Sequence, residues 1–375
     1  MYVNPTKYDQ SLPLINRSAS ISEIKWATKF LRIPSWSFGY NKCDSEHTEV
    51  SCYELHRSAK IIERWENAVK SKTNIGTIFV NVSSTSITFP DKLSMLYHGL
   101  LIAVVTNRDL VTYRTVFEPI SLPISIRNPF PYENPGILIE TNHLFSCSDL
   151  SERNPNIFIS GASWPQVLYT HPALAPKIRE YFGFHAAHML GNYLFGQIEN
   201  PSSECFYSSP QTVIEGWVFA GDKGMLLPHE YYQYLPRCAV DSYSSSIVTN
   251  EINGNFDLNQ ENSTTPLYKN IYKFNDGITK ETVCALRKIT SAKKIVQTFG
   301  SRLGFWATAL QGSKASFVNG IDKICTNFTN SQQGSLWHTY CPYQKRNYLY
   351  RANNYLFLCG NNIDDVKQFI TYLLW

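Results

Sequence analysis

A segment in the last third of the chain combines a hydroxyl, small residues and cations in a spacing suited to anion binding. The run Lys294-Ile295-Val296 predicts a short strand, and Ser301 stands where it would cap a following helix. A helix N-terminus directs backbone N–H groups towards an anion, so the segment from Ser301 to Lys314 is a candidate diphosphate cradle. The alternative is an ordinary capped helix that packs an aromatic face into the core.

The same segment resembles, without gaps, Ser-Thr-Phe-Gly-Tyr-Val-Ala-Gln-Gly-Leu-Gly-Gly-Leu-Lys of the xyloglucan fucosyltransferase family. The identical positions are Ser301, Gly304, Ala307, Leu310, Gly312 and Lys314. The resemblance implies a turn in the donor domain, near a GDP-sugar. Arg302 replaces a threonine, and an arginine at a helix N-terminus can hold a phosphate as a bidentate fork.

Two further segments resemble the family but each lacks one of its arginines. Thr88 to Val111 resembles a Gly-Leu-Gly-Asn-Arg turn followed by an apolar helix, with Lys92 in place of the arginine. A lysine keeps the charge but not the planar geometry. The run from His188 to Phe195 resembles His-Leu-Gly-Arg-Tyr-Leu-Phe, with Asn192 in place of the arginine.

The strand-like run 212–219 resembles the family's Ile-Gln-Val-Arg-Val-Phe, whose arginine is expected to meet the donor diphosphate. Trp217 stands at that position. Tryptophan cannot neutralise a leaving diphosphate, so the electrostatic stabilisation must come from elsewhere or be absent. The candidates for a substitute are Arg302, Lys223 and Lys314.

Hydrophobic periodicity predicts the elements that position these residues. Residues 51–70 have the pattern of an amphipathic helix. The strand 76–82, the helix 91–105 and the strand 110–113 together predict a parallel βαβ unit. Further predictions are an irregular lead-in over 1–50, loops over 115–160, a strand at 246–249, and helices at 279–292 and 362–375.

Composition and motifs exclude several functional classes. The formal net charge is +4 over 375 residues and no basic run interleaves with aromatics, which disfavours a nucleic-acid surface. No window approaches the ~20 apolar residues of a membrane span. We find no Asp-x-Asp, so a donor site without a metal ion is expected, and no cofactor is implied. His185 and His188 share a helical face, but no ligand pattern accompanies them, and packing or polar contacts are the favoured roles.

The sequons and cysteines permit a lumenal glycoprotein. Four sequons occur, at Asn16, Asn81, Asn262 and Asn327. None of the nine cysteines forms a CxxC pair, and Cys325, Cys341 and Cys359 resemble the family's cysteine-rich C-terminal part, which implies pairing there. Family members usually carry an N-terminal Golgi anchor; the first residues here have no apolar signal core, so we expect either that the anchor is missing from this sequence or that the protein is placed differently. The expected location is the lumen of the Golgi or the secretory pathway.

The predicted fold is α/β, with two Rossmann-like domains facing across a cleft (GT-B-like), as the resemblance implies. Residues 1–200 would form the acceptor-side domain and 201–375 the nucleotide-sugar-binding domain. The predicted activity is inverting, metal-independent transfer of fucose from GDP-fucose to a glycan hydroxyl, and no carboxylate is assigned as the base. The predicted donor-binding residues are Ser301, Arg302, Gly304, Trp217, Lys314 and Lys92. The alternatives are a catalytically silent protein that binds glycans or partners, and a transferase using another nucleotide sugar.

Overall fold

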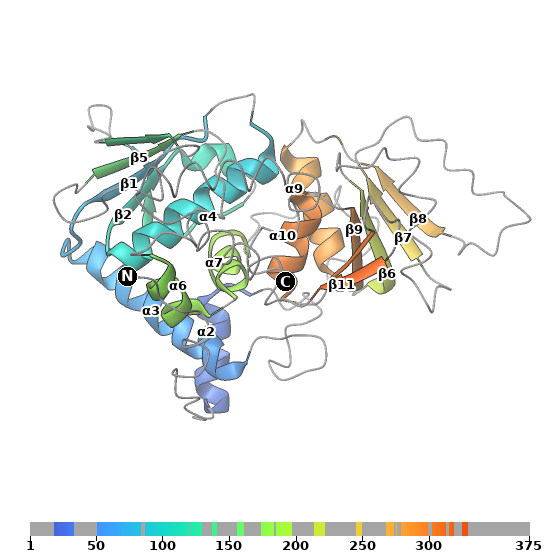
Figure 1. Ribbon diagram of the computed structural model, residues 1–375, viewed down its shortest axis with the longest axis horizontal. Coiled ribbons are helices and arrows are strands. Elements are labelled where there is room, and N and C mark those ends of the chain that lie inside the picture. The colour runs from blue at the N-terminus through green and yellow to red at the C-terminus, as the bar shows by residue number, and fades with distance from the viewer. Residues whose placement is uncertain are drawn as a thin grey trace, which may run out of the picture.

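The structure is a computed structural model in which part of the chain is described (Figure 1). The described residues are 19–33, 51–83, 87–118, 120–129, 137–140, 156–160, 174–183, 185–196, 214–221, 245–249, 268–273, 275, 279–298, 302–312, 315–318 and 325–328. They form two β-sheets with helices, which confirms the mixed α/β class. The predicted domain boundary near residue 200 and the predicted helix 362–375 lie outside these residues.

The first sheet has five parallel strands in the order β3-β2-β1-β5-β4. Its strands are β1 (Thr77–Val80), β2 (Asp109–Thr112), β3 (Ile126–Arg127), β4 (Ile137–Glu140) and β5 (Asn156–Ser160). The parallel pairing of β1 with β2 confirms the predicted βαβ unit. The prediction of loops over 115–160 was wrong at β3, β4 and β5, because the prolines there flank short β-branched runs without interrupting them. Residues 130–136 and 141–155 of that range lie outside the described residues.

Helix α4 (Phe89–Thr106) connects β1 to β2 and packs against both strands. Its Gly99 permits a close approach, since a Cβ there would lie 2.3 Å from Val80 Cγ2. The helix ends at Asn107, whose φ of 53° is the left-handed conformation that asparagine tolerates. The result is an apolar helix buried along almost its whole length.

Helices α2, α3, α6 and α7, together with the first sheet and α4, form what we call the first half of the molecule, the described residues up to 196. Their bounds are Ile21–Phe30, Cys52–Lys70, Ala175–Phe182 and Ala186–Phe195. Helix α3 confirms the predicted amphipathic helix and begins with a capping box between Ser51 and Glu54. Helix α2 corrects the prediction of an irregular lead-in, because its own capping box, Ser20 with Glu23, starts a helix in a polar segment.

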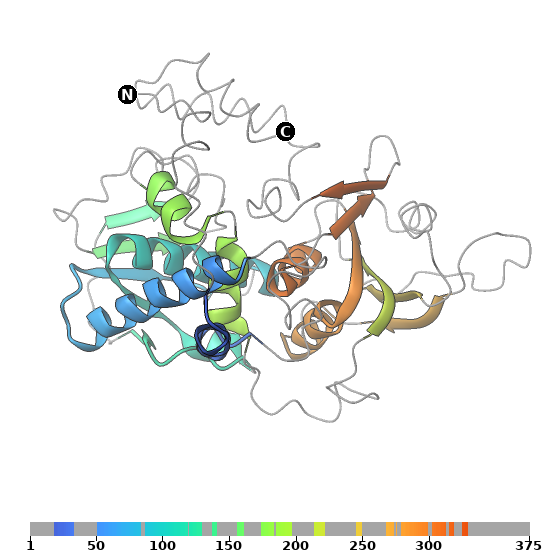
Figure 2. The ribbon, with the colours of Figure 1, turned by 90° about the horizontal axis from the view of Figure 1, so that it is seen from below.

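The second sheet has six strands in the order β11-β10-β9-β6-β7-β8, all parallel except β11. They are β6 (Ile214–Gly221), β7 (Ser245–Thr249), β8 (Tyr268–Lys273), β9 (Ala292–Thr298), β10 (Ala315–Val318) and β11 (Cys325–Phe328). Helices α9 (Thr279–Thr290) and α10 (Arg302–Gln311) pack against this sheet. Figures 1 and 2 show both helices between the two sheets.

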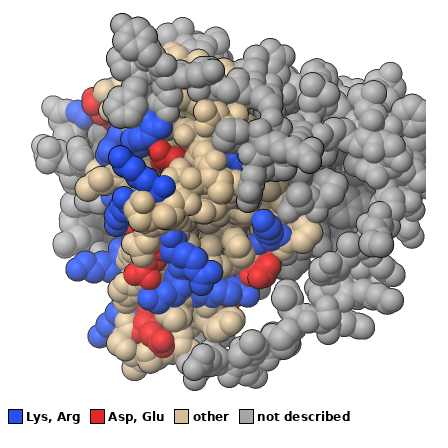
Figure 3. Space-filling model, turned by 90° about the vertical axis from the view of Figure 1, so that its left-hand side faces the viewer, with Lys and Arg blue, Asp and Glu red and all other residues tan. Residues whose placement is uncertain are grey.

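The outer surface of the first half carries charges of both signs. Figure 3 shows Lys and Arg side chains interspersed with Asp and Glu. Ion pairs on α3 join Lys60 to Glu63 at 2.9 Å and Lys70 to Glu66 at 3.5 Å. This pattern is typical of solvated helix faces. No helix among the described residues is long and apolar enough to cross a membrane.

Candidate functional site

The candidate site lies where two helices begin. Helix α4 starts after the carboxyl end of β1, and α10 starts after the carboxyl end of β9. In open parallel α/β sheets, ligands bind outside the carboxyl ends of the strands. Both helices therefore present their N-termini at the edges where ligands bind in folds of this kind.

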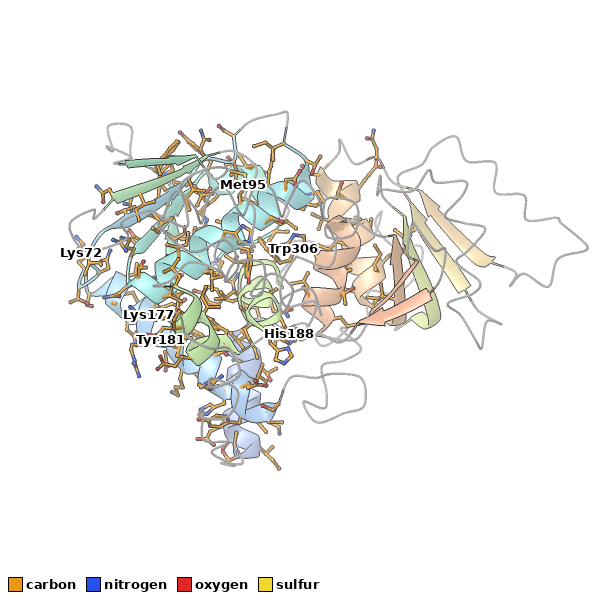
Figure 4. The ribbon with its side chains drawn as sticks, viewed as in Figure 1. Lys72, Met95, Lys177, Tyr181, His188 and Trp306 are labelled. Atoms are coloured by element: carbon orange, nitrogen blue, oxygen red, sulfur yellow. The ribbon has the colours of Figure 1, made fainter. Side chains whose placement is uncertain are left out.

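Trp306 joins these two helix starts. It lies in the second turn of α10, and its indole Nε1 donates hydrogen bonds to Pro90 O at 3.2 Å and to Ser94 Oγ at 3.1 Å. Pro90 belongs to the first turn of α4 and Ser94 to the second. The start of α10 is thereby held against the start of α4, and Figure 4 shows Trp306 between the first half and α10.

Aromatic rings enclose the indole. Trp306 is fully buried and meets Tyr97 of α4 edge to face, with ring centroids 5.4 Å apart. It meets Phe195 of α7 in the same way at 5.6 Å. Gly191 of α7 allows this approach, because a Cβ there would lie 3.1 Å from Trp306 Cζ3. The predicted alternative, an aromatic helix face packed into the core, is thus confirmed for Trp306.

The predicted donor-binding residues are only partly covered by the structure. Arg302 is the first residue of α10, and Gly304 is buried in its first turn. Lys92 is half-buried in the first turn of α4. Trp306, in the turn of α10 that follows Arg302 and Gly304, contacts Pro90 in the turn of α4 that carries Lys92. The other predicted residues of the 301–314 segment, Ser301 and Lys314, lie outside the described residues.

The N-terminus of α4 is not capped by its own N-cap side chain. The Thr88 hydroxyl donates to Asp91 Oδ2 at 2.7 Å instead of accepting from a helix N–H. Thr88 accepts only through its backbone carbonyl, from the Lys92 amide at 3.0 Å. The first N–H groups of this helix therefore depend on partners other than the N-cap side chain.

Trp217 occupies a central strand of the second sheet. It pairs in register with Lys294 of β9 and with Ser245 of β7, and β6 continues for four more positions to Gly221. Four residues of strand correspond to about 13 Å. The backbone of Trp217 thus lies well before the carboxyl edge, and its assignment to the donor site stays a prediction.

Asn192 binds the C-terminal end of α10, not its start. It is fully buried on α7, and its Nδ2 donates to Leu310 O and to His188 O, each at 2.8 Å. Leu310 O belongs to the last turn of α10, whose carbonyls have no partner within the helix. The arginine that Asn192 replaces would therefore stand at the C-terminal end of α10, and its loss does not bear on the charge at the helix start.

The two predicted histidines act in packing and polar contacts. His188 Nδ1 lies 3.0 Å from Ala309 O, and since a carbonyl only accepts, the ring nitrogen donates. Burial lowers the pKa of His188 to about 4, so the ring is neutral near pH 7. His185 precedes α7 as its N-cap, with Nε2 3.9 Å from Glu54 Oε2. In the described part of the chain, no group of three or more His, Cys, Asp or Glu side chains could hold a metal ion.

Sequence reasoning did not identify Trp306 and Pro90 as the residues that join α10 to the start of α4, or Gly191 as the residue that leaves room for the indole. The available signal was a tryptophan at the centre of the candidate cradle, where the resembling family segment has valine. Nothing local identified its partners, because Pro90 lies 216 positions away in the chain.

Comparison with known proteins finds a similar fold but no similar sequence. No protein-family model and no curated protein sequence matches the chain. Among solved structures, it is similar to a GDP complex of an arginine-to-lysine mutant of Arabidopsis thaliana FUT1, with 12% identity and a TM-score of 0.52. The match covers 76% of this chain and 84% of that chain. At this identity the likeness shows the fold alone: the chain has a fucosyltransferase-like α/β fold.

Proposed function

We propose that this protein is a glycosyltransferase that moves fucose from GDP-fucose to a glycan hydroxyl, with inversion and without a metal ion. The observation that carries the proposal is the contact of Trp306, in the second turn of α10, with the first turn of α4, in two helices that each start after the carboxyl end of a parallel strand. The GDP in the structurally similar FUT1 complex supports the choice of nucleotide. Residues 1–200 would bind the acceptor and 201–375 the donor.

The chemistry suits this arrangement because the difficulty in glycosyl transfer is the departure of a diphosphate. The acceptor oxygen attacks the anomeric carbon, loses its proton to a base, and the sugar–phosphate bond breaks to release GDP. Negative charge grows on the leaving phosphate, and helix N-termini with nearby cations stabilise it. Lys92 and Arg302 are the cationic residues in the two first turns.

The first experiment is calorimetric titration of the purified protein with GDP, GDP-fucose and UDP-sugars, in buffer containing EDTA. We expect micromolar binding of GDP, about 8 kcal/mol, and weaker binding of UDP. Incubation of GDP-fucose with a panel of glycans, followed by detection of released GDP, then tests transfer. Absence of binding to every nucleotide would overturn the proposal, and preference for UDP would favour a transferase with another donor.

Matched variants locate the site. Lys92→Ala removes one cation from the α4 turn and is expected to weaken GDP binding about tenfold, the value of one charge-assisted hydrogen bond. Lys29→Ala removes an exposed cation from α2 and controls for net charge. Equal GDP affinities in these two variants would contradict the placement of the diphosphate at α4.

A second candidate, a catalytically silent protein that binds glycans or partners, is favoured by Trp217. The replacement of an arginine by tryptophan removes a cation that the family resemblance places at the diphosphate. Trp217→Arg separates the candidates: GDP affinity should rise if the donor site is intact but weakened. Unchanged affinity in a folded variant would show that position 217 is not part of that site.

For location, we propose the lumen of the Golgi or the secretory pathway, with glycan modification at the sequons. Asn81, in one of them, is half-exposed, and its Oδ1 accepts from Ser83 Oγ at 2.6 Å and from Ser83 N at 3.1 Å. Peptide mapping after treatment with an endoglycosidase tests occupancy. Unmodified peptides from protein secreted by eukaryotic cells would contradict this location.

A further inference from the structure

Trp306 belongs to α10, which packs against the second sheet, and its indole contacts helices of the first half. Its hydrogen bonds depend on distance and direction. Two hydrogen bonds reach α4, and ring contacts reach both α4 and α7. Hydrogen bonds of this type keep their strength only over a few tenths of an ångström around 2.9 Å. A shift of α10 along α4 by about 1 Å would therefore break the bonds to Pro90 and Ser94.

Helix α10 has separate contacts that hold it to its own sheet. Gln311, which is fully buried, donates from Nε2 to Thr290 O at 3.0 Å and to Ala292 O. Thr290 ends α9 and Ala292 begins β9, so this side chain binds α10 to the second sheet. The hydrogen bonds of Trp306 connect α10 to α4 in the first half, and α10 is held to its own sheet without them.

We propose that Trp306 is a positioning residue, which sets the separation of the first turns of α4 and α10 so that both turns hold one nucleoside diphosphate. The inference rests on the proposed function and adds to it that nucleotide affinity depends on a contact from the first half of the chain. Four residues, or about 6 Å of helix, separate Arg302 from Trp306. Trp306 thus lies one helical turn after the turn that it is proposed to position.

The test compares two buried tryptophans. Trp306→Phe keeps an aromatic ring against Tyr97 and Phe195 but removes the N–H group. The matched control is Trp65→Phe on α3, because the Trp65 Nε1 also donates to a carbonyl, Arg108 O at 2.6 Å, within the first half only. Both variants should lose thermal stability, and only Trp306→Phe should weaken GDP binding, by about tenfold.

A double-variant measurement separates positioning from general destabilisation. If Trp306 acts by placing the α4 turn, Lys92→Ala should cost much less affinity in the Trp306→Phe background than in the wild type. Independent losses that multiply would indicate that the two residues are not coupled and would overturn the inference. Should Trp306→Phe fail to fold, Ser94→Ala removes one of the two acceptors, with an expected loss of about threefold in GDP affinity.

The outcomes distinguish the inference from the function on which it rests. If the wild type binds GDP and the Trp306→Phe and Ser94→Ala variants bind it equally well, the positioning role is wrong and the proposed function stands. If the wild type binds no nucleotide, both proposals are wrong.

Discussion

The start of α4 and the end of α10 differ in which groups bind their terminal backbone atoms. At the end of α10, the last carbonyls are taken by protein groups: Gly312 N–H bonds to Thr308 O at 2.9 Å, His188 to Ala309 O and Asn192 to Leu310 O. At the start of α4, the Thr88 hydroxyl is directed to Asp91. At the end of α10, which we call the closed end, buried side chains bind the last carbonyls. At the start of α4, the N-cap side chain does not bind the first N–H groups.

This difference separates structural from functional positions. Polar groups at the closed end satisfy buried backbone, so changes there should cost stability and leave ligand binding intact. Lys92, the cation in the first turn of α4, is proposed to meet the donor diphosphate, so its removal should cost binding and little stability. The predictions below test this division, from the largest expected effect to the smallest.

Acidification should destabilise the fold through His188, which binds the C-terminal end of α10. The folded-state pKa of His188 is lowered to about 4 from 6.5, so between these pH values the unfolded state binds a proton at this residue and the folded state does not. Its contribution to stability is present above pH 6.5 and is lost as pH falls towards 4, by up to about 3 kcal/mol. Urea unfolding of wild type and His188→Gln between pH 7.5 and pH 4.5 measures this. Parallel pH profiles for the two proteins would refute it.

Asn192→Leu should destabilise the fold by about 2 kcal/mol, because it leaves Leu310 O buried without its side-chain donor. The free energy of unfolding by denaturant gives the loss, and GDP affinity measured well below the melting temperature should be unchanged. A variant that retains stability but loses GDP binding would place Asn192 in the donor site after all.

Gly312→Ala should cost about 1 to 2 kcal/mol of stability. Gly312 has a φ of 70°, and a Cβ there would lie 2.8 Å from the His188 ring. Because the effect combines backbone strain with displacement of His188, the double variant with His188→Ala should recover part of the loss. Thermal melts of the four proteins check this, and simple additivity would show that the ring does not matter.

Arg302→Ala should have the smallest effect on stability and a clear effect on binding. Its guanidinium is proposed to meet the donor diphosphate at the start of α10, so GDP affinity should fall about tenfold with the melting temperature nearly unchanged. Arg302→Lys should recover only part of the affinity, because lysine lacks the bidentate geometry. An unaltered titration curve for Arg302→Ala would remove this residue from the site.

Local patterns predicted the main elements around the site. The periodicity of residues 51–70 and the strand–helix–strand alternation over 76–113 are local, and the structure follows them within a residue or two. The strand and helix of the candidate cradle, β9 and α10, were also predicted. Several elements were not predicted. They are helix α2 in a polar segment, helix α6, the short strands β3, β4 and β5 among prolines, and the strands β8, β10 and β11.

Pairwise resemblance was less informative about the roles of single residues. Lys92, Asn192 and Trp217 each replace a family arginine, and the sequence offered one explanation for all three, a weakened donor site. The structure separates them: Lys92 lies at the start of α4, Asn192 at the end of α10, and Trp217 within a central strand. The replacement of an arginine has a different consequence at each position, because the surroundings differ.

By itself, the sequence determined the helix over 51–70, the strand–helix–strand unit over 76–113, and the strand and helix of the candidate cradle, since side-chain periodicity and capping residues act over a few positions. Only the tertiary structure decided that α10 lies against α4 and α7. That contact depends on Trp306 meeting Pro90, Tyr97 and Phe195, which lie more than a hundred positions earlier in the chain. Burial of the indole with both of its hydrogen bonds made is a property of the folded surface, and no local pattern encodes it.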